Sequence, residues 1–423
     1  MTLNIFHLVL QIAVILVAAR IVGFLFQKIN QPQVMGEMVA GILLGPSLLG
    51  WLAPGASAAL FPAASLSYLN ALSQVGLVVF MFVVGLALDP SELHGYGHAA
   101  VLTSHVSIVA PFCLGGLTAL YFYPRLSDDS VTFTHFALFM GAAMSITAFP
   151  VLARILTERG LLRSRMGTLA VACAAVDDVT GWCILAYIVV LVRVAHAARP
   201  AWVTIAGSFV YVFIMLVVVR RLLPALERAF RKRDHLSDNL LALIVVLVLA
   251  SALATEWLGI HLLFGAFLMG AIMPKAPDFT RYLLHKFESV TVVLLLPLFF
   301  AYTGLRTRIG VGGGHAIWFY SAIVIVVAIT GKLGGSMFAA RLAGMPWREA
   351  AALGVLMNTR GLMELVILNI GLDIGVISQA MFSIMVLMAL VTTFMTTPLL
   401  EWVYPTRLFR AQVTSEEVHQ SVA

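Results

Sequence analysis

Two adjacent carboxylates, Asp177 and Asp178, lie in the sequence AVDDVTGW, inside an apolar run long enough to cross a membrane. An ionised carboxylate at that depth is costly, so such groups usually face a cavity or a charged partner and carry function. A neighbouring pair of carboxylates needs a cation, a proton or a basic side chain close by. The pair therefore predicts a site at which cations and protons compete.

Lys332 is the basic side chain that suits this pair. It lies in the sequence TGKLGG, too far from either end of its apolar run for the ammonium group to reach the interface comfortably. Adjacent residues of a helix point about 100° apart. We therefore expect one of the two carboxylates to meet Lys332 and the other to face an aqueous funnel, although Lys332 has the alternative of pairing elsewhere.

A polar interruption, SITAFP, breaks another apolar run at residues 145–150. Pro150 removes a backbone donor and disturbs the preceding helical turn. The freed carbonyls, together with Ser145 and Thr147, are candidate ligands for a small cation or for the ends of a broken helix. The alternative for Pro150 is a simple kink.

A similar interruption, NTRGLME, lies at residues 358–364. Arg360 and Glu364 are four residues apart and can pair on one helical face, while Gly361 permits an unwound turn. If two broken helices cross in mid-membrane, four helix ends meet and their partial charges need compensation, which Arg360 and Glu364 can supply. We favour such a structural ion pair over direct cation ligation.

The composition shows what kind of element must hold these residues. The chain has 423 residues, of which 61% are hydrophobic and 11% charged, against about 25% charged in a soluble domain. Apolar runs of about 20 residues recur from end to end, which predicts an all-α polytopic membrane protein. We count thirteen candidate transmembrane helices. Their approximate limits are 4–27, 33–50, 65–88, 99–123, 131–157, 166–192, 202–223, 237–256, 259–275, 284–306, 316–341, 349–371 and 377–403.

The distribution of Lys and Arg predicts the orientation. With the N-terminus outside and the C-terminus in the cytoplasm, 18 of the 26 Lys and Arg residues fall on the inside and five on the outside. Loop placement thus accounts for the net charge of +6, and we expect no nucleic-acid partner. This assigns residues 1–405 to a transmembrane domain in the inner (cell) membrane and residues 406–423 to a short cytoplasmic tail.

An internal repeat relates the two halves of the chain. The pattern GxxxxG followed by proline occurs at residues 36–46 and again at 265–274. Residues 80–86 resemble residues 299–305. Thr147, followed by Ile155-Leu156, resembles Thr359, followed by Ile367-Leu368 at the same spacing. The offset corresponds to seven spans, an odd number, which predicts an inverted repeat with an ion site between the halves. Chance recurrence of Gly and Pro is the alternative.

These motifs, taken in order, resemble one protein family. The chain is similar to the monovalent cation:proton antiporters, in the branch with bacterial sodium/proton antiporters, membrane domains of potassium efflux systems and plant cation/proton exchangers. The carriers of the resemblance are QPQVMGEMVAGILLGP, SITAFPVLARIL, AVDDVTGW, HLLFGAFLMGAIMP, PLFFAYTGL, GKLGG and NTRGLMELVILNIG.

The resemblance implies a homodimer in membrane lipid, each protomer having a dimerisation domain and a mobile core domain with two crossed, broken helices. It implies that Asp178 carries the cation and the proton, that Asp177 partners Lys332, and that Thr147 contributes at the crossing. The expected substrates are small cations (Na⁺, Li⁺ or K⁺) and H⁺. The nucleotide-binding regulatory domain of potassium efflux members has no counterpart in the printed sequence, so control by NAD or glutathione is not expected.

Two other functions stay open at this point. One is potassium/proton exchange at the same site, because carboxylate oxygens alone do not separate Na⁺ from K⁺. The other is a channel-like or sensor protein that kept the fold without coupling. An enzyme is not expected, and neither is a cofactor, because the sequence offers no phosphate loop, metal cluster or nucleophile constellation.

Overall fold

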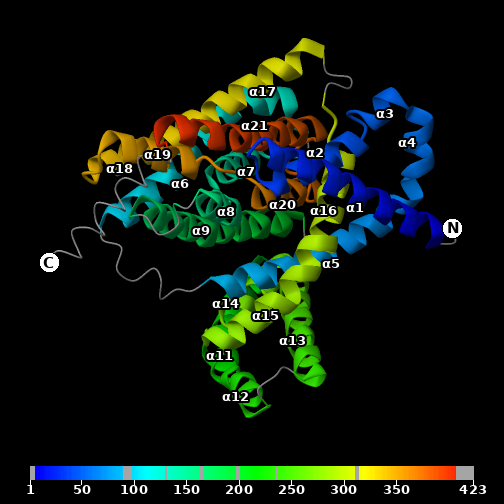
Figure 1. Ribbon diagram of the computed structural model, residues 1–423, viewed down its shortest axis with the longest axis vertical. Coiled ribbons are helices and arrows are strands. Elements are labelled where there is room, and N and C mark those ends of the chain that lie inside the picture. The colour runs from blue at the N-terminus through cyan, green and yellow to red at the C-terminus, as the bar shows by residue number, and fades with distance from the viewer. Residues whose placement is uncertain are drawn as a thin grey trace. The chain divides into compact units, whose positions relative to one another are not determined.

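The computed structural model describes residues 5–88, 98–128, 131–159, 161, 165–196, 201–233, 237–309 and 314–405 (Figure 1). Every regular element among these residues is a helix. The predicted tail at 406–423 lies outside the described residues, so a domain boundary at residue 405 stays a prediction.

The chain divides into two compact units. The first unit comprises Met1–Ile21, Glu37–Leu93 and Leu185–Arg306, and the second comprises Val22–Gly36, His94–Ile184 and Thr307–Ala423. Three helices pass from one unit to the other along the chain: α1 (Ile5–Lys28), α2 (Gln33–Leu44) and α9 (Arg165–His196).

The first unit contains the helices of the N-terminal and middle parts of the chain. They are α3 (Leu49–Leu52), α4 (Pro54–Leu60), α5 (Ala63–Ala87), α10 (Ala201–Phe213), η2 (Ile214–Val219), α11 (Arg220–Leu222), α12 (Pro224–Arg233), α13 (Asp238–Trp257), α14 (Leu262–Ala271), α15 (Pro277–Val290), η3 (Thr291–Leu295) and α16 (Leu296–Arg306). The η segments are π-helical turns.

The second unit contains all the remaining helices. They are α6 (His98–Leu126), α7 (Phe133–Ser145), α8 (Phe149–Glu158), α17 (Gly314–Ile329), η4 (Thr330–Gly334), α18 (Gly335–Leu342), α19 (Trp347–Met357), α20 (Leu362–Asp373) and α21 (Gln379–Val403).

All thirteen predicted segments have helical counterparts, but they are not equally long. Eleven helices of the described residues are long and apolar enough to cross a membrane, and the pair α19 and α20, bent by 43°, forms a twelfth. The remaining segment, predicted at 259–275, is the ten-residue helix α14, which at 1.5 Å per residue extends only about 15 Å. The count of thirteen complete crossings therefore stays a prediction.

The internal repeat appears in the first unit as two equivalent contacts. On one side, a Cβ added to Gly41 of α2 would overlap the Phe300 carbonyl of α16. On the other, a Cβ added to Gly270 of α14 would overlap the Phe82 carbonyl of α5. The repeat equates α2 with α14 and α16 with α5, so each half of the repeat supplies one helix to each contact. The glycines at these positions allow the backbones to approach closely.

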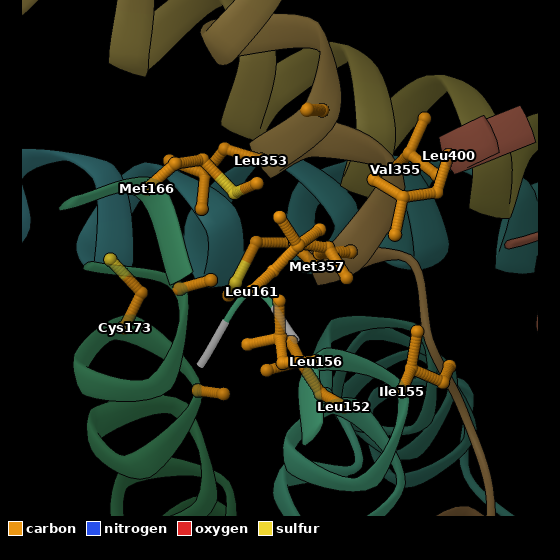
Figure 2. Packing of buried hydrophobic residues seen from close by; sticks show 14 of the residues in the cluster. Leu152, Ile155, Leu156, Leu161, Met166, Cys173, Leu353, Val355, Met357 and Leu400 are labelled. Carbon is orange, nitrogen blue, oxygen red and sulfur yellow. The ribbon is translucent and has the colours of Figure 1, made fainter. Parts of the chain in front are cut away.

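The second unit is built around a core of apolar side chains from α8, α9, α19 and α21. Leu152 and Leu156 of α8 are fully buried, as are Leu353 and Met357 of α19. Figure 2 shows these side chains packed with Met166 and Cys173. This core holds α8, the second half of one broken span, and α19, the first half of the other, against α9, the helix that carries the aspartate pair.

Candidate functional site

The two predicted helix breaks meet in the second unit. Residues 146–148 separate α7 from α8, and residues 358–361 separate α19 from α20. The backbone N–H of Ala148 donates to the carbonyl of Thr359 at 3.0 Å, and Oγ1 of Thr147 lies 3.0 Å from the carbonyl oxygen of Met357. The two crossed, broken helices expected from the sequence are therefore present.

Pro150 and Gly361 each mark the start of a helix after a break. Pro150 lies in the first turn of α8, where its missing N–H costs little because no intrahelical acceptor is available there. It therefore begins a helix rather than kinking one. Gly361 is the last residue of the unwound segment 358–361 and has an extended φ of 170°. The restriction is space, since an added Cβ would lie 2.7 Å from Cγ2 of Val151.

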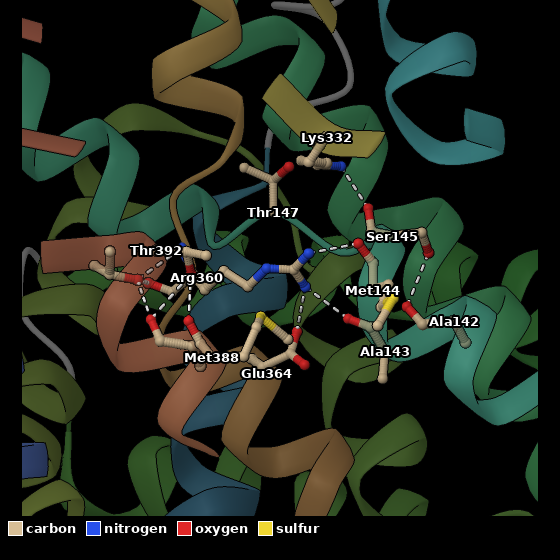
Figure 3. A network of polar contacts seen from close by, with 12 residues as sticks. Ala142, Ala143, Met144, Ser145, Thr147, Lys332, Arg360, Glu364, Met388 and Thr392 are labelled. Atoms are coloured by element: carbon tan, nitrogen blue, oxygen red, sulfur yellow. Dashed lines mark hydrogen bonds and ion pairs between the residues drawn. The ribbon is translucent and has the colours of Figure 1, made fainter. Parts of the chain in front are cut away.

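Two cationic side chains bind the carbonyl groups at the end of α7 (Figure 3). Arg360 donates from Nη1 to Ala143 at 2.7 Å and from Nη2 to Met144 at 2.5 Å. Lys332 donates from Nζ to the carbonyl of Ser145. The last carbonyls of a helix lack partners and carry partial negative charge. The broken end of α7 is thus satisfied by two positive charges.

Arg360 and Glu364 form the predicted ion pair. Nη1 of Arg360 lies 2.8 Å from Oε2 of Glu364, and both side chains are buried. Glu364 lies in the first turn of α20, where a carboxylate is favourable because the helix N-terminus is positive. The pair therefore compensates the end of α7 and the start of α20 together.

Asp177 is surrounded by hydrogen-bond donors. Oδ2 lies 2.6 Å from Nζ of Lys332 and accepts from the hydroxyl of Thr147 at 2.9 Å. Ser107 Oγ lies 2.9 Å from each carboxylate oxygen, and Ser104 donates to Oδ1 at 3.1 Å. The pairing of Asp177 with Lys332 is thus present. Ser104 and Ser107 were not predicted.

Lys332 lies in the π-helical turn η4 and has three acceptors for its three ammonium protons. Besides Asp177 and the carbonyl of Ser145, Nζ donates to the carbonyl of Ser107 at 2.9 Å. A π-turn within a helix is often found at a functional site. Here it places the lysine between α6, the break after α7, and α9.

Asp178 contrasts with its neighbour. Its carboxylate accepts from the backbone N–H of Phe149 at the start of α8, but Oδ1 has no partner among the described residues. The residue is 2% exposed, so in this conformation it does not face the aqueous funnel expected from the sequence. Oδ1 is therefore the oxygen that the described residues leave free for another ligand.

Ser145 participates through its backbone rather than its hydroxyl. The hydroxyl donates to the carbonyl of Ala142 at 2.8 Å, within its own helix, while the carbonyl accepts from Lys332. Thr147 instead uses its hydroxyl, which links Asp177 to the end of α19.

Comparison with known proteins assigns the chain to a family. The family described as "Sodium/hydrogen exchanger, transmembrane" matches residues 13–402. The chain belongs to the sodium/hydrogen exchanger family. It is 45% identical over 395 residues to the Na⁺/H⁺ antiporter NhaS4 of Synechocystis, covering 93% of this chain and 96% of that protein.

Two more distant relatives are longer proteins. Cation/H⁺ antiporter 17 of Arabidopsis thaliana is 40% identical and K⁺/H⁺ antiporter 1 of Saccharomyces cerevisiae is 31% identical. The match covers 94% and 93% of this chain but only 48% and 46% of those proteins, so the chain spans about half their length. These relatives are named as transporters, not enzymes.

A solved structure shows the same fold. The sodium proton antiporter MjNhaP1 of Methanocaldococcus jannaschii matches with a TM-score of 0.61 at 13% identity, covering 95% of this chain and 98% of that one. Together with the apolar helices, the family membership makes this exchanger homologue a multi-pass membrane protein.

Proposed function

We propose that this protein is a secondary active antiporter that exchanges a monovalent cation, in the first place Na⁺, for protons, with Asp178 as the shared carrier. One observation carries the proposal. Of two adjacent buried aspartates, Asp177 is paired with Lys332 and three hydroxyls, whereas Asp178 keeps an oxygen without a partner among the described residues. Asp178 is thus the carboxylate available to a substrate.

Coupling follows from competition for this carboxylate. A bound proton neutralises Asp178 and excludes the cation, and a bound cation excludes the proton. If the site changes sides only with its charge compensated, the two fluxes run in opposite directions. One pH unit supplies about 1.4 kcal/mol per proton, and a membrane potential supplies about 2.3 kcal/mol per charge per 100 mV.

The other site residues hold this carboxylate in place. Lys332 and Asp177 form a fixed ion pair beside it, and Thr147 ties that pair to the crossing. Arg360 and Glu364 stabilise the helix ends and do not bind the cation.

The choice of Na⁺ is supported by the 45% identity to a protein named as a Na⁺/H⁺ antiporter. A K⁺/H⁺ exchanger is the second candidate, favoured by the 31% identity to a protein with that name. An uncoupled channel-like or sensor relative is a weaker candidate, since three buried charges at the aspartate pair would have no use in it.

The assembly is proposed to be a homodimer in the inner membrane, with the N-terminus outside and the C-terminus in the cytoplasm. All the site residues lie within the second unit, which supports its assignment as the moving core. The first unit is then the dimerisation domain. Crosslinking of purified protein in lipid tests the dimer.

Transport by proteoliposomes tests the function. The parent protein should drive proton movement when a gradient of Na⁺, Li⁺ or K⁺ is imposed. The rates of proton movement with the three ions give its cation preference. Asp178→Asn should abolish this movement while the protein remains folded. Asp128→Asn, which changes an exposed carboxylate, is the matched control and should be active. Normal exchange by Asp178→Asn would exclude the proposed carrier.

A further inference from the structure

Two buried oxygens in the break between α19 and α20 have no hydrogen-bond partner in the described part of the chain. Asn358 is 1% exposed and Thr359 is fully buried. Neither Oδ1 of Asn358 nor Oγ1 of Thr359 has a hydrogen-bond partner among the described residues. A buried polar atom left unpaired is costly, and native structures contain few of them, so each needs an explanation such as a bound ion or water.

These oxygens belong to the same part of the crossing as Asp178. The carbonyl of Thr359 accepts from the N–H of Ala148 at 3.0 Å, and the carboxylate of Asp178 accepts from the N–H of the next residue, Phe149. Thr359 and Asp178 are therefore held by consecutive backbone amides at the start of α8. Oδ1 of Asp178 is likewise buried and has no partner among the described residues.

Oε1 of Glu364 and Nε of Arg360 also have no hydrogen-bond partner among the described residues, but these two side chains are bound to each other as an ion pair. The hydroxyl of Thr147 has acceptors in Asp177 and Met357, and the hydroxyl of Ser145 donates within α7. Asp178, Asn358 and Thr359 thus offer one carboxylate, one amide and one hydroxyl oxygen that have no partner among the described residues. Such a set suits a monovalent cation, because protein oxygens can replace the water that a cation loses on binding.

We propose that Asn358 and Thr359 are ligands of the transported cation, whose coordination they complete together with Asp178. This inference rests on the proposed antiport function and deepens it. The amide and hydroxyl oxygens bind a cation but do not take up a proton near neutral pH. They therefore favour the cation in its competition with the proton at Asp178, and their loss weakens cation binding alone.

The test compares the apparent KM for Na⁺ in proteoliposomes. Asn358→Leu and Thr359→Val should each raise the KM about tenfold, which corresponds to about 1.4 kcal/mol. The maximal rate at saturating Na⁺ should stay close to that of the parent. Ser336→Ala and Thr397→Val are matched controls, because they remove buried hydroxyls that also have no partner among the described residues but lie on α18 and α21. Their KM should not change.

A second pair of variants keeps the test valid if Thr359→Val does not fold. Thr359→Ser and Thr359→Cys have nearly equal side-chain volumes but offer oxygen and sulfur, and sulfur is a poor ligand for hard cations. The serine variant should keep the parent KM and the cysteine variant should raise it. Equal KM values for these two variants, or a KM for Asn358→Leu within twofold of the parent, would mean that the oxygens hold water only, and would overturn the proposal.

Failure of the proposed function would look different. In that case the parent itself would show no cation-driven proton movement, or Asp178→Asn would remain active.

Discussion

Nζ of Lys332 lies 2.6 Å from Oδ2 of Asp177, and neither side chain has any exposed surface. A buried ion pair of this kind is costly to break, because removal of one partner leaves the other charge uncompensated. The pair also has the hydroxyls of α6 and of the α7–α8 break around it, so it joins three parts of the second unit. Variants that remove one partner or both therefore allow the contribution of this pair to stability to be measured.

Lys332→Gln should destabilise the protein by about 3–5 kcal/mol, the usual range when a buried pair loses one partner. Lys332→Gln combined with Asp177→Asn should recover part of this loss, since no isolated charge remains. Thermal melting of the two single variants and the double variant in detergent gives the coupling free energy. Strictly additive effects would show that the two residues do not stabilise each other.

Ser107→Ala should destabilise the protein more than Ser104→Ala, because Oγ of Ser107 lies 2.9 Å from both oxygens of Asp177 and that of Ser104 lies 3.1 Å from one. The expected loss is about 1–3 kcal/mol for Ser107. Both effects should shrink in an Asp177→Asn background. Thr103→Val is the control on the same helix, as its buried hydroxyl has no partner among the described residues. Equal melting of Ser107→Ala and the control would argue against this network.

Arg360→Lys should destabilise the protein nearly as much as Arg360→Ala. The guanidinium reaches the carbonyls of Ala143 and Met144 and the carboxylate of Glu364 at once, and an ammonium group lacks this planar, multidentate geometry. We expect losses of about 3 kcal/mol or more, measured by thermal melting. Arg220→Ala, at an exposed position, should melt like the parent. A fully stable Arg360→Lys would show that charge alone is sufficient.

Gly304→Ala should destabilise the first unit by about 1–3 kcal/mol, the usual cost of overpacking. An added Cβ would overlap the backbone of Gly41 on α2, so one helix must shift. Gly334→Ala is the control, because nothing lies within 4 Å of a Cβ added there. Thermal melting compares the stability of the two variants. Similar melting temperatures would mean that the α2–α16 contact has room to relax.

The charged part of the site was predictable because charges are rare in apolar runs. Arg360 and Glu364 could be paired from their types and spacing alone, and Lys332 could be paired with one of the two aspartates, while the choice of Asp177 came from the family resemblance. The breaks were also predictable, since proline and glycine interrupt helices in both halves of the repeat.

The hydroxyl groups were not predictable in the same way. Ser104 and Ser107 stand three residues apart on one face of α6, which is a usable signal, but serine is common in membrane helices and usually bonds to its own helix. Their partner, Asp177, lies about 70 residues further along the chain. Nothing local in the sequence marks that contact.

The surroundings of Asp178 depend on the conformation rather than on the sequence. The expected aqueous funnel requires the site to be open to one side, whereas here the carboxylate is 2% exposed. An alternating site has closed states as well as open ones, and the same residues serve all of them.

The end of α7 is held by side chains from two other segments, Lys332 from η4 and Arg360 from the break after α19. Each of these side chains is also tied to a carboxylate, on α9 or on α20. A force applied to any one of these helices is therefore shared by the rest, and the crossing resists being stretched at its breaks. The breaks interrupt the helices, yet these contacts between helices make the crossing rigid.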